Sequence, residues 1–377
     1  MWKILVKIEN SVLKVIIADV APKEYDDPEL DKRMEELENL AHTYGSLIVV
    51  KKIQKRTQPD FHTYIGSGKL EEIIEDMKTM GATVLIIWNI LKPKQVYNIN
   101  KELEKFGFQV RDRVDLILKI FDKHAKNTEA KLQIELASIK HMGPRIFGMG
   151  MEMSRQWGWS TLARWLGETN TEIMKRHLKN RKGEIERKLK QYENMRHLHR
   201  EWRVRKGLLT VGIVGYTNAG KSSLMRALTH KQVLVEDKLF ATLGTSVAKM
   251  YVPSLNWRGY EILINDTIGF MRDLPPQLIQ AFRSTLEDSI ESQLLLHVID
   301  ASDPYCAEKI VVVDQILEEI GADQKKLYVF NKVDLVAPEV LAELKKTFAG
   351  FQPLYISTLA SFWLEELKQE IVNKLGL

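Results

Sequence analysis

A glycine-rich segment is the feature that most constrains the fold of this 377-residue chain. The residues GYTNAGKS, at 215–222, follow the apolar run LLTVGIVG and precede a helical pattern. They fit the pattern G-x-x-x-x-G-K-[ST], in which backbone amides surround phosphates, the lysine neutralises them and the hydroxyl binds Mg²⁺. The segment therefore predicts a strand, a phosphate-binding loop (P-loop) and a helix in direct succession.

Two later motifs indicate that the nucleotide carries guanine. Asp266 and Gly269 stand in the sequence DTIG after the strand-like run YEILIN, where the carboxylate would hold the metal's second shell and the Gly269 amide would lie near the γ-phosphate. The sequence FNKVD, at 330–334, follows a later strand-like run, KKLYVF. There Asp334 can accept from N1 and N2 of guanine, a donor pair that adenine lacks, while Lys332 lies over the ring and Asn331 ties this loop to the P-loop. Three motifs in this order predict GTP binding.

The predicted site also includes the segment DKLFATL and the turn ISTLA near the end of the chain. We expect Mg²⁺ to be held by Ser222, Thr242 and Asp266, and catalysis to depend on Lys221, Thr242 and Gly269. The product would be GDP. The expected nucleotide-binding residues are Gly215, Tyr216, Thr217, Asn218, Ala219, Gly220, Lys221, Ser222, Ser223, Phe240, Thr242, Asp266, Gly269, Asn331, Lys332, Asp334, Ser357 and Thr358.

The overall pattern predicts an α/β fold class. Short β-branched runs alternate with helical patterns from residue 11 to about 110, which predicts a small parallel α/β domain at 1–114. Strands and helices alternate again over 207–377. We expect this last part to be a P-loop GTPase domain with a doubly wound parallel sheet.

The middle of the chain is helical in pattern. Residues 115–206 carry two apolar stripes that an antiparallel pair of long helices would bury, so we expect a helical hairpin there. Residues 143–167 are the expected connecting loop. The stripes are Leu132, Leu136 and Ile139 on one helix and Leu178, Ile185 and Tyr192 on the other.

The net charge of +5 is concentrated in one segment of this hairpin. Between Glu172 and Lys206, thirteen Lys or Arg residues stand against five Glu and no Asp, so this segment carries +8. Such a run often forms only a solvated helix face. Because matching acids are lacking, we favour contact with RNA phosphates.

The sequence gives few indications of the cellular compartment in which the protein works. Charged residues interrupt the first twenty positions and no stretch approaches eighteen uncharged apolar residues, which excludes a signal peptide and a membrane-spanning helix. The single cysteine, Cys306, has no partner for an internal disulfide and suits a reducing compartment. We therefore expect a cytoplasmic protein.

The motifs together resemble the HflX family of ribosome-associated GTPases. The resemblance runs from about residue 50 to 360 and includes TYIGSGKLEEI, GYTNAGKSSL, DKLFATL, DTIGFMRDLPPQLIQAFRSTLED, LHVIDASDP and NKVD. It implies three domains that together dock on the large ribosomal subunit. We expect a monomer that contacts rRNA through the basic hairpin. The implied function is GTP-dependent ribosome binding, with splitting or rescue of ribosomes. In the cytoplasm, we expect association with ribosomes or a membrane surface.

Several segments depart from the family pattern. The chain reads RQWGWSTLARWLGETN where the family has a glycine-rich loop, and it ends without the extra C-terminal domain of some relatives. The Trp-rich loop puts the usual reach into the ribosome in question. The departing residues are Trp157, Trp159 and Trp165, then Gly244, Thr245 and Ser246 in place of Asp-Pro-Thr, and Thr358 in place of Ala.

Phe270 follows Gly269, at the place where many GTPases carry a water-orienting glutamine. An aromatic ring cannot orient water, so another group must do so. Asn218 either helps to hold a K⁺ ion against the phosphates, as in GTPases with a similar P-loop, or only fits the turn geometry of the loop. Thr242 is the expected switch hydroxyl, with Thr245 as the alternative.

Two other features of the sequence give weaker evidence of function. The sequence GSGK at 66–69 lacks the remaining P-loop residues and predicts a turn with a helix start, although the resemblance suggests ATP binding by the first domain. The histidines show no metal-ligand pattern with cysteine, and we expect structural or phosphate-facing roles for His124, His141, His177, His197 and His199.

Two rival functions remain open. A tRNA-modification GTPase shares the apolar switch residue and the asparagine in the P-loop, but it normally needs a cofactor-binding domain and a cysteine-bearing C-terminus, whereas this chain ends in KLGL. A nucleotide-gated RNA-binding module with negligible turnover is the second rival, and it holds if nothing replaces the glutamine.

Overall fold

The computed structural model describes residues 12–22, 28–125, 127–156, 170–229, 246–253, 259–267, 269–272, 278, 291–360 and 363–377. They form two compact units. One unit comprises the residues up to Lys123 with Ile134–Ile185, and the other comprises His124–Gln133 with Glu186–Leu377. The long helices α5 (Thr128–Gln156) and α6 (Asn170–Arg205) contribute to both units. The predicted three-part division at residues 114 and 206 stays a prediction.

The first unit is built on a four-stranded parallel sheet in the order β2-β1-β3-β4. Because helices cover both faces of such a sheet, its inner strands are apolar throughout, and every residue of β3 is buried. The expected small parallel α/β domain is confirmed. Its elements are β1 (Leu13–Ala21), α1 (Pro28–Tyr44), β2 (Ser46–Lys55), α2 (Ser67–Met80), β3 (Val84–Ile87), α3 (Pro93–Leu103), β4 (Gln109–Asp112) and α4 (Arg113–His124).

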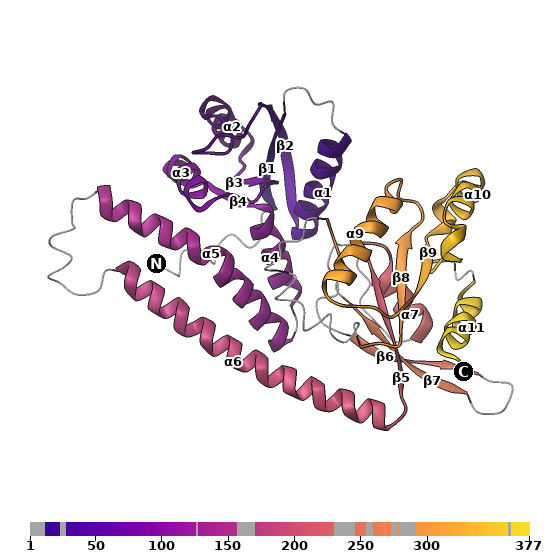
Figure 1. Ribbon diagram of the computed structural model, residues 1–377. Helices are drawn as coiled ribbons and strands as arrows, with labels where there is room; N and C mark the ends of the chain where they lie inside the picture. Colours follow the sequence, from indigo (N-terminus) through magenta and orange to yellow (C-terminus); the bar gives the residue numbers. More distant parts are fainter. Residues whose placement is uncertain are drawn as a thin grey trace. The chain divides into compact units, whose positions relative to one another are not determined.

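The helices of this unit lie on the two faces of its sheet (Figure 1). On one face, Ile73 and Met77 of α2 and Ile99 of α3 pack with Ile16 and Leu85 of the central strands. α1 lies on the other face. α2 starts at Ser67, so the GSGK sequence is a turn with a helix start, as predicted.

Helices α5 and α6 form an antiparallel pair, and two ion pairs show which of their residues lie opposite each other. Glu135 accepts from Arg181 Nε at 2.7 Å, and Glu129, nearer the start of α5, pairs with Arg196, nearer the end of α6. Ile185, from the predicted stripe, is fully buried.

The predicted connecting loop is wrong over residues 143–156, because α5 continues through Pro144 to Gln156. The segment contains Pro144 and three glycines, so helix propensity does not explain the extension. Tertiary contacts override propensity here, because Arg145 is buried and forms ion pairs with Asp112 and Asp115. Trp157, Trp159 and Trp165 lie outside the described residues.

The second unit contains a six-stranded sheet in the order β10-β9-β8-β5-β7-β6. Its strands are parallel except β6, which pairs antiparallel with β7. The elements are β5 (Leu209–Gly215), α7 (Lys221–Thr229), β6 (Ser246–Val252), β7 (Tyr260–Asp266), β8 (Leu294–Asp300), α9 (Cys306–Glu319), β9 (Lys325–Asn331), α10 (Pro338–Thr347), β10 (Leu354–Tyr355) and α11 (Leu364–Leu375).

Helices pack on both faces of this sheet. Leu224 of α7 and Ile371 of α11 join one apolar cluster with Ile213 of β5, whereas Ile310 of α9 packs with Phe330 of β9 in another. The predicted doubly wound α/β fold is therefore confirmed. Because the strands are parallel, the ends of β5, β8 and β9 meet at one edge of the sheet, where ligands of such folds bind.

Candidate nucleotide-binding site

The P-loop connects the end of β5 to the start of α7. Gly215 has φ 147° and Gly220 has φ 90°, values that side chains rarely allow. A Cβ on Gly215 would collide with the carbonyl of Val298 on the neighbouring strand β8. Asn218 has φ 64°, and asparagine tolerates this left-handed conformation better than most residues. Loop geometry alone thus gives a reason for asparagine at position 218.

Lys221, the first residue of α7, is buried under the loop. Its Nζ donates to the carbonyl oxygen of Tyr216 at 2.6 Å. Burial lowers the pKa of Lys221 to about 8, while the charge of Asp266 opposes this shift. An anion beside Nζ would stabilise the charged form, so the loop is electrostatically suited to a phosphate.

Ser222 and Asp266 bring two oxygen donors together below the loop. Ser222 Oγ donates to Asp266 Oδ2 at 2.8 Å, and Asp266 is fully buried at the end of β7. The pairing of β7 with β5 places Asp266 beside Ile213, two residues before the P-loop begins. A hydroxyl and a carboxylate are ligands that Mg²⁺ prefers, so this donor set fits the ion.

The DTIG segment lies directly against the P-loop. A Cβ on Gly269 would come within 2.8 Å of Lys221 Nζ and 2.9 Å of Thr217 Cα. The Phe270 amide donates to Gly215 O at 3.1 Å, and the Thr217 amide donates to Phe270 O at 2.7 Å. The Phe270 side chain is buried. Its backbone is therefore fixed to the P-loop and its ring lies within the protein.

A second contact holds the same segment. The Arg272 amide donates to Tyr216 Oη at 2.8 Å, and the Arg272 guanidinium pairs with Glu308 of α9 at 2.9 Å. Lys309 Nζ lies 4.8 Å from the centre of the Tyr216 ring. Tyr216 thus links the P-loop to the segment after Gly269.

Asn331 connects the FNKVD segment to both neighbouring loops. This fully buried side chain donates through Nδ2 to Ala219 O at 3.0 Å and accepts through Oδ1 from the Thr358 amide at 3.1 Å. A Cβ on Gly220 would collide with Nδ2. The P-loop, the base-side loop and the turn at 357–358 are therefore held together by one amide group.

The remaining base-side residues surround this asparagine. Lys332 adopts φ 63°, and its Nζ pairs with Asp300 Oδ2 at 2.7 Å. Asp334 lies in the short helical turn Val333–Leu335 and is exposed. Ser357 is buried, and its Oγ accepts from the Ala360 amide at 3.0 Å. Phe240, Thr242 and Thr245 lie outside the described residues.

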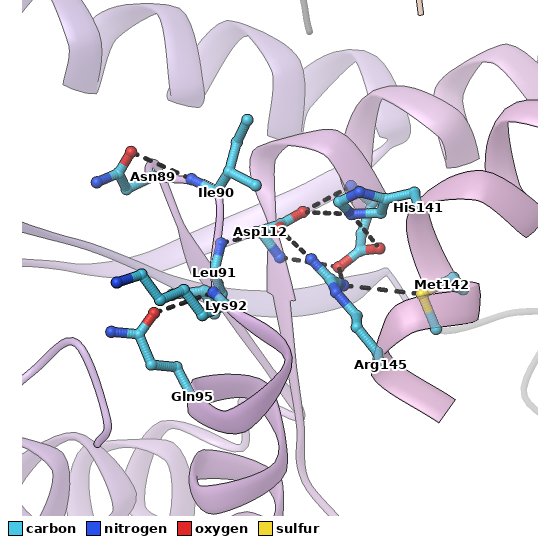
Figure 2. Close-up of polar contacts among 10 residues, drawn as sticks. Asn89, Ile90, Leu91, Lys92, Gln95, Asp112, His141, Met142 and Arg145 are labelled. Carbon is cyan, nitrogen blue, oxygen red and sulfur yellow. Dashed lines mark hydrogen bonds and ion pairs between the residues drawn. The ribbon is translucent and has the colours of Figure 1, made fainter. Parts of the chain in front are cut away.

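A second polar cluster, in the first unit, was not foreseen from the sequence (Figure 2). The ligand-type atoms of Asp112, Asp115 and His141 lie close enough together for one metal ion. His141 Nε2 is 3.3 Å from an oxygen of each aspartate. Arg145 enters the same cluster, pairing with Asp115 at 2.6 Å and with Asp112. Arg145 thus forms ion pairs with both carboxylates that a metal would need.

The charges of this cluster balance. Burial opposes the charged form of His141, but hydrogen bonds to Asp112 and Asp115 raise its pKa to about 9. Burial likewise opposes ionisation of Asp115, but His141 and Arg145 lower its pKa below the usual range. Two carboxylates therefore face two cations. A metal would have to displace Arg145 and deprotonate His141, so we interpret the cluster as structural.

The two aspartates of this cluster follow a pattern that could have been recognised in the sequence. Asp112 precedes α4, and Asp115 is its third residue; the Asp115 amide donates to Asp112 Oδ1 at 2.9 Å and the Asp112 amide donates to Asp115 Oδ2 at 3.1 Å. This reciprocal pattern is a capping box. His141 and Arg145 lie one helical turn apart on α5, but nothing local indicates which carboxylates they meet.

The cluster predicts a pH-dependent stability of the first unit. The pKa of His141 is raised to about 9 in the fold, above the usual 6.5, so its contribution is complete below pH 6.5 and is lost as the pH rises through 9. We expect a loss of about 2–3 kcal/mol over this interval. Hydrogen exchange of α4 amides, corrected for intrinsic rates, would measure it, and His141→Gln should flatten the profile. An unchanged pH profile in His141→Gln would contradict the assignment.

Part of the basic charge of α6 is neutralised within the hairpin. Arg181 pairs with Glu135 and Glu184, Arg196 with Glu129, and Arg205 with Glu201. Lys179 and Lys190 are exposed and form no ion pair with any residue the structure describes. They are the better candidates for contact with an external anion.

Among the described residues, no helix combines the length and apolar character needed to cross a bilayer.

Comparison with known proteins matches most of the chain to three family models. Family models described as GTP-binding GTPase N-terminal, GTP-binding GTPase Middle Region and 50S ribosome-binding GTPase match residues 31–122, 124–203 and 210–332. GTPase HflX of Caldanaerobacter subterraneus subsp. tengcongensis is 39% identical over 97% of this chain and 81% of its own length. GTPase HflX of Escherichia coli is 38% identical over 81% of this chain and 71% of its own length.

Among solved structures, the complex of SsGBP with GDP is similar to this chain. It matches with a TM-score of 0.52 and 28% identity, and the match covers 96% of this chain and 98% of that one. The chain therefore belongs to the HflX family of GTPases.

Proposed function

We propose that this chain binds GTP, hydrolyses it to GDP and phosphate, and uses its nucleotide state to control docking on the large ribosomal subunit. The observation that carries the nucleotide assignment is a pair of hydrogen bonds at Asn331. Its Nδ2 donates to Ala219 O, and its Oδ1 accepts from the Thr358 amide. They couple a phosphate-binding loop to the loop that carries Asp334. A guanine recognised at Asp334 would then have its phosphates in the P-loop.

The residues of the P-loop supply charge and orientation for phosphoryl transfer. Lys221 would neutralise the outer phosphates and regain its full charge beside them. Ser222 and Asp266 would hold Mg²⁺, directly and through its second shell, and the ion would stabilise charge on the phosphates when bound. The Gly269 amide would donate to the γ-phosphate, and Thr242 remains our candidate for the switch hydroxyl.

Phe270 takes no direct part in this proposal. Its peptide pairs with Gly215 and Thr217, and its buried ring is held away from solvent. The attacking water would instead be aligned by Thr242 and the bound cations, with Asn218 offered as a ligand for K⁺. The left-handed backbone at Asn218 also supports the purely geometric alternative, so the K⁺ site needs its own test.

Phe270→Gln tests this division of roles. We expect no gain in turnover, because a side chain at this position is buried and its backbone is fixed to the P-loop. The rate of phosphate release in KCl and in NaCl would measure both the variant and the cation effect. A large gain in Phe270→Gln would mean that nothing in the chain replaces the missing carboxamide. Equal rates in the two salts would leave Asn218 with its geometric role alone.

Docking on the ribosome is supported by two independent observations. The family model that matches residues 210–332 is described as a 50S ribosome-binding GTPase. Helix α6 carries most of the positive excess of the chain, and Lys179 and Lys190 lie on one face of it, about three turns apart. RNA phosphates are the partner that such a charge excess attracts. We propose splitting or rescue of ribosomes by a cytoplasmic monomer as the resulting activity.

Sedimentation with isolated large and small subunits and a non-hydrolysable GTP analogue tests the docking. We expect the parent to travel with large subunits, and Lys179→Glu with Lys190→Glu to weaken this binding severalfold and to lower its salt dependence. The matched control, Lys325→Glu with Lys346→Glu, makes the same charge change on exposed lysines of the GTPase domain. Equal losses in both double variants would favour a general charge effect over contact through α6.

Two outcomes would favour the rival functions. Binding of tRNA in preference to ribosomal subunits would favour a tRNA-modification GTPase. Nucleotide-dependent RNA binding without phosphate release would favour a binding module with negligible turnover.

A further inference from the structure

Phe61 is an unusually exposed aromatic residue, with 67% of its surface accessible, in the turn between β2 and α2. The carboxylate of Asp60 fixes this turn by accepting from the His62 amide at 2.8 Å and the Thr63 amide at 3.1 Å. The amides of Asp60 and Tyr64 also exchange hydrogen bonds of 2.8 and 3.0 Å with each other's carbonyls. The ring is thus presented by a rigid backbone.

Helix α3 holds the same turn from its other side. The buried Gln95 donates to Asp60 O at 3.0 Å and accepts from the Lys92 amide at 3.0 Å, a contact visible in Figure 2. Asn98 donates to His62 O at 2.9 Å. A buried amide that bridges two segments costs stability unless both bonds form, so the position of Phe61 relative to α3 is well determined.

Two lysines from the start of α3 flank the ring. Lys92 Nζ and Lys94 Nζ lie 5.8 and 6.0 Å from the centre of Phe61, and neither forms an ion pair with a residue that the structure describes. The nearby Asp60 carboxylate is occupied by the turn amides and by Arg56 at 3.6 Å. His62 meets Phe61 edge to face, with ring centres 5.3 Å apart.

Phe106, another exposed phenylalanine of this unit, serves as a comparison for Phe61. It is 45% exposed, and Lys78 Nζ lies 3.9 Å from its ring. Lys78, however, pairs with Glu75 at 2.7 Å, so this neighbourhood is neutral. The site around Phe61 differs because its positive charge is uncompensated and its ring is more open.

We propose that Phe61, Lys92 and Lys94 form a stacking site for an unpaired base of large-subunit rRNA, with the two lysines meeting the flanking phosphates. This inference rests on the proposed docking on the ribosome and names a contact for it in the first unit. An apolar partner surface would gain from the ring but would have to desolvate both lysines. An RNA strand offers a flat base and negative charge together, which matches both features of the site.

Two binding measurements on the full chain test the site: cosedimentation with large subunits and fluorescence anisotropy of a labelled, single-stranded oligoadenylate. We expect Phe61→Ala to weaken both about tenfold, since loss of base stacking on an aromatic ring has effects of this order. Phe61→Tyr should retain binding, whereas Phe61→Leu should behave as Phe61→Ala does. Phe106→Ala is the matched control and should bind as the parent does.

The variants separate stacking from other causes. Parent-like binding by Phe61→Leu would mean an apolar contact, as with a protein partner, and would overturn the proposal. Equal losses in Phe61→Ala and Phe106→Ala, or no loss in either assay, would overturn it as well. A parent that fails to sediment with subunits counts against ribosome docking itself, and the oligoadenylate assay then decides the stacking site alone.

Discussion

Asp334→Asn is expected to weaken GTP binding about a hundredfold, because the charged acceptor for guanine N1–H and N2–H is replaced by a group that is partly a donor. The same variant should gain affinity for xanthosine triphosphate. Xanthine carries a carbonyl in place of the 2-amino group, and the asparagine amide can donate to it while its oxygen accepts from N1–H. Loss of one ligand with gain of the other is a result that unfolding cannot produce.

Asp323→Asn is a suitable control for this experiment. Asp323 is exposed just before β9, whereas Asp334 follows β9, so the two lie toward opposite ends of that strand. The charge change is identical, and we expect no change in either affinity. Calorimetric titration with both nucleotides would measure the exchange of specificity. Unchanged GTP affinity in Asp334→Asn would refute the base assignment, and equal losses in both variants would indicate a general charge effect.

Much of the GTPase unit could be predicted because its signals are local. Each motif follows an apolar run that becomes a buried parallel strand, and parallel strands bring their carboxyl ends to one edge. The sequence therefore predicted that Asn331 would meet the P-loop, and the structure has its Nδ2 on Ala219 O. The first unit was predictable in the same way, from strands such as β3 whose every residue is apolar and buried.

The features that could not be predicted depend on distant partners. The sequence predicted a loop from residue 143, yet α5 continues to Gln156, because the buried ion pairs of Arg145 override the low helix propensity around Pro144. The pairing of the Phe270 peptide with Gly215 and Thr217 has no sequence pattern at all. His141 and Arg145 meet Asp112 and Asp115 only because α5 packs beside the end of β4, and no periodicity specifies that approach.

Arg145→Met is expected to destabilise the first unit strongly. Its side chain is 3% exposed and pairs with Asp112 and Asp115, which are 0% and 14% exposed. Removal of the guanidinium leaves two carboxylates against one imidazolium in a buried site. Breaking such a buried pair typically costs about 3–5 kcal/mol. Hydrogen exchange over residues 109–124 would report this loss as faster opening of β4 and α4.

A second arginine of the hairpin offers the control, because it also forms two ion pairs, of 2.7 and 2.9 Å, but in contact with solvent. Arg181 pairs with Glu135 and Glu184, but its side chain is 40% exposed, so Arg181→Met should cost less than about 1 kcal/mol. The double variant Asp115→Asn with Arg145→Met restores charge balance around His141, and its asparagine oxygen can still accept from the Asp112 amide. We therefore expect it to recover part of the lost stability. If Arg145→Met and Arg181→Met opened equally, or the double variant were worse than Arg145→Met alone, buried charge balance would not be what holds α5 to the end of β4.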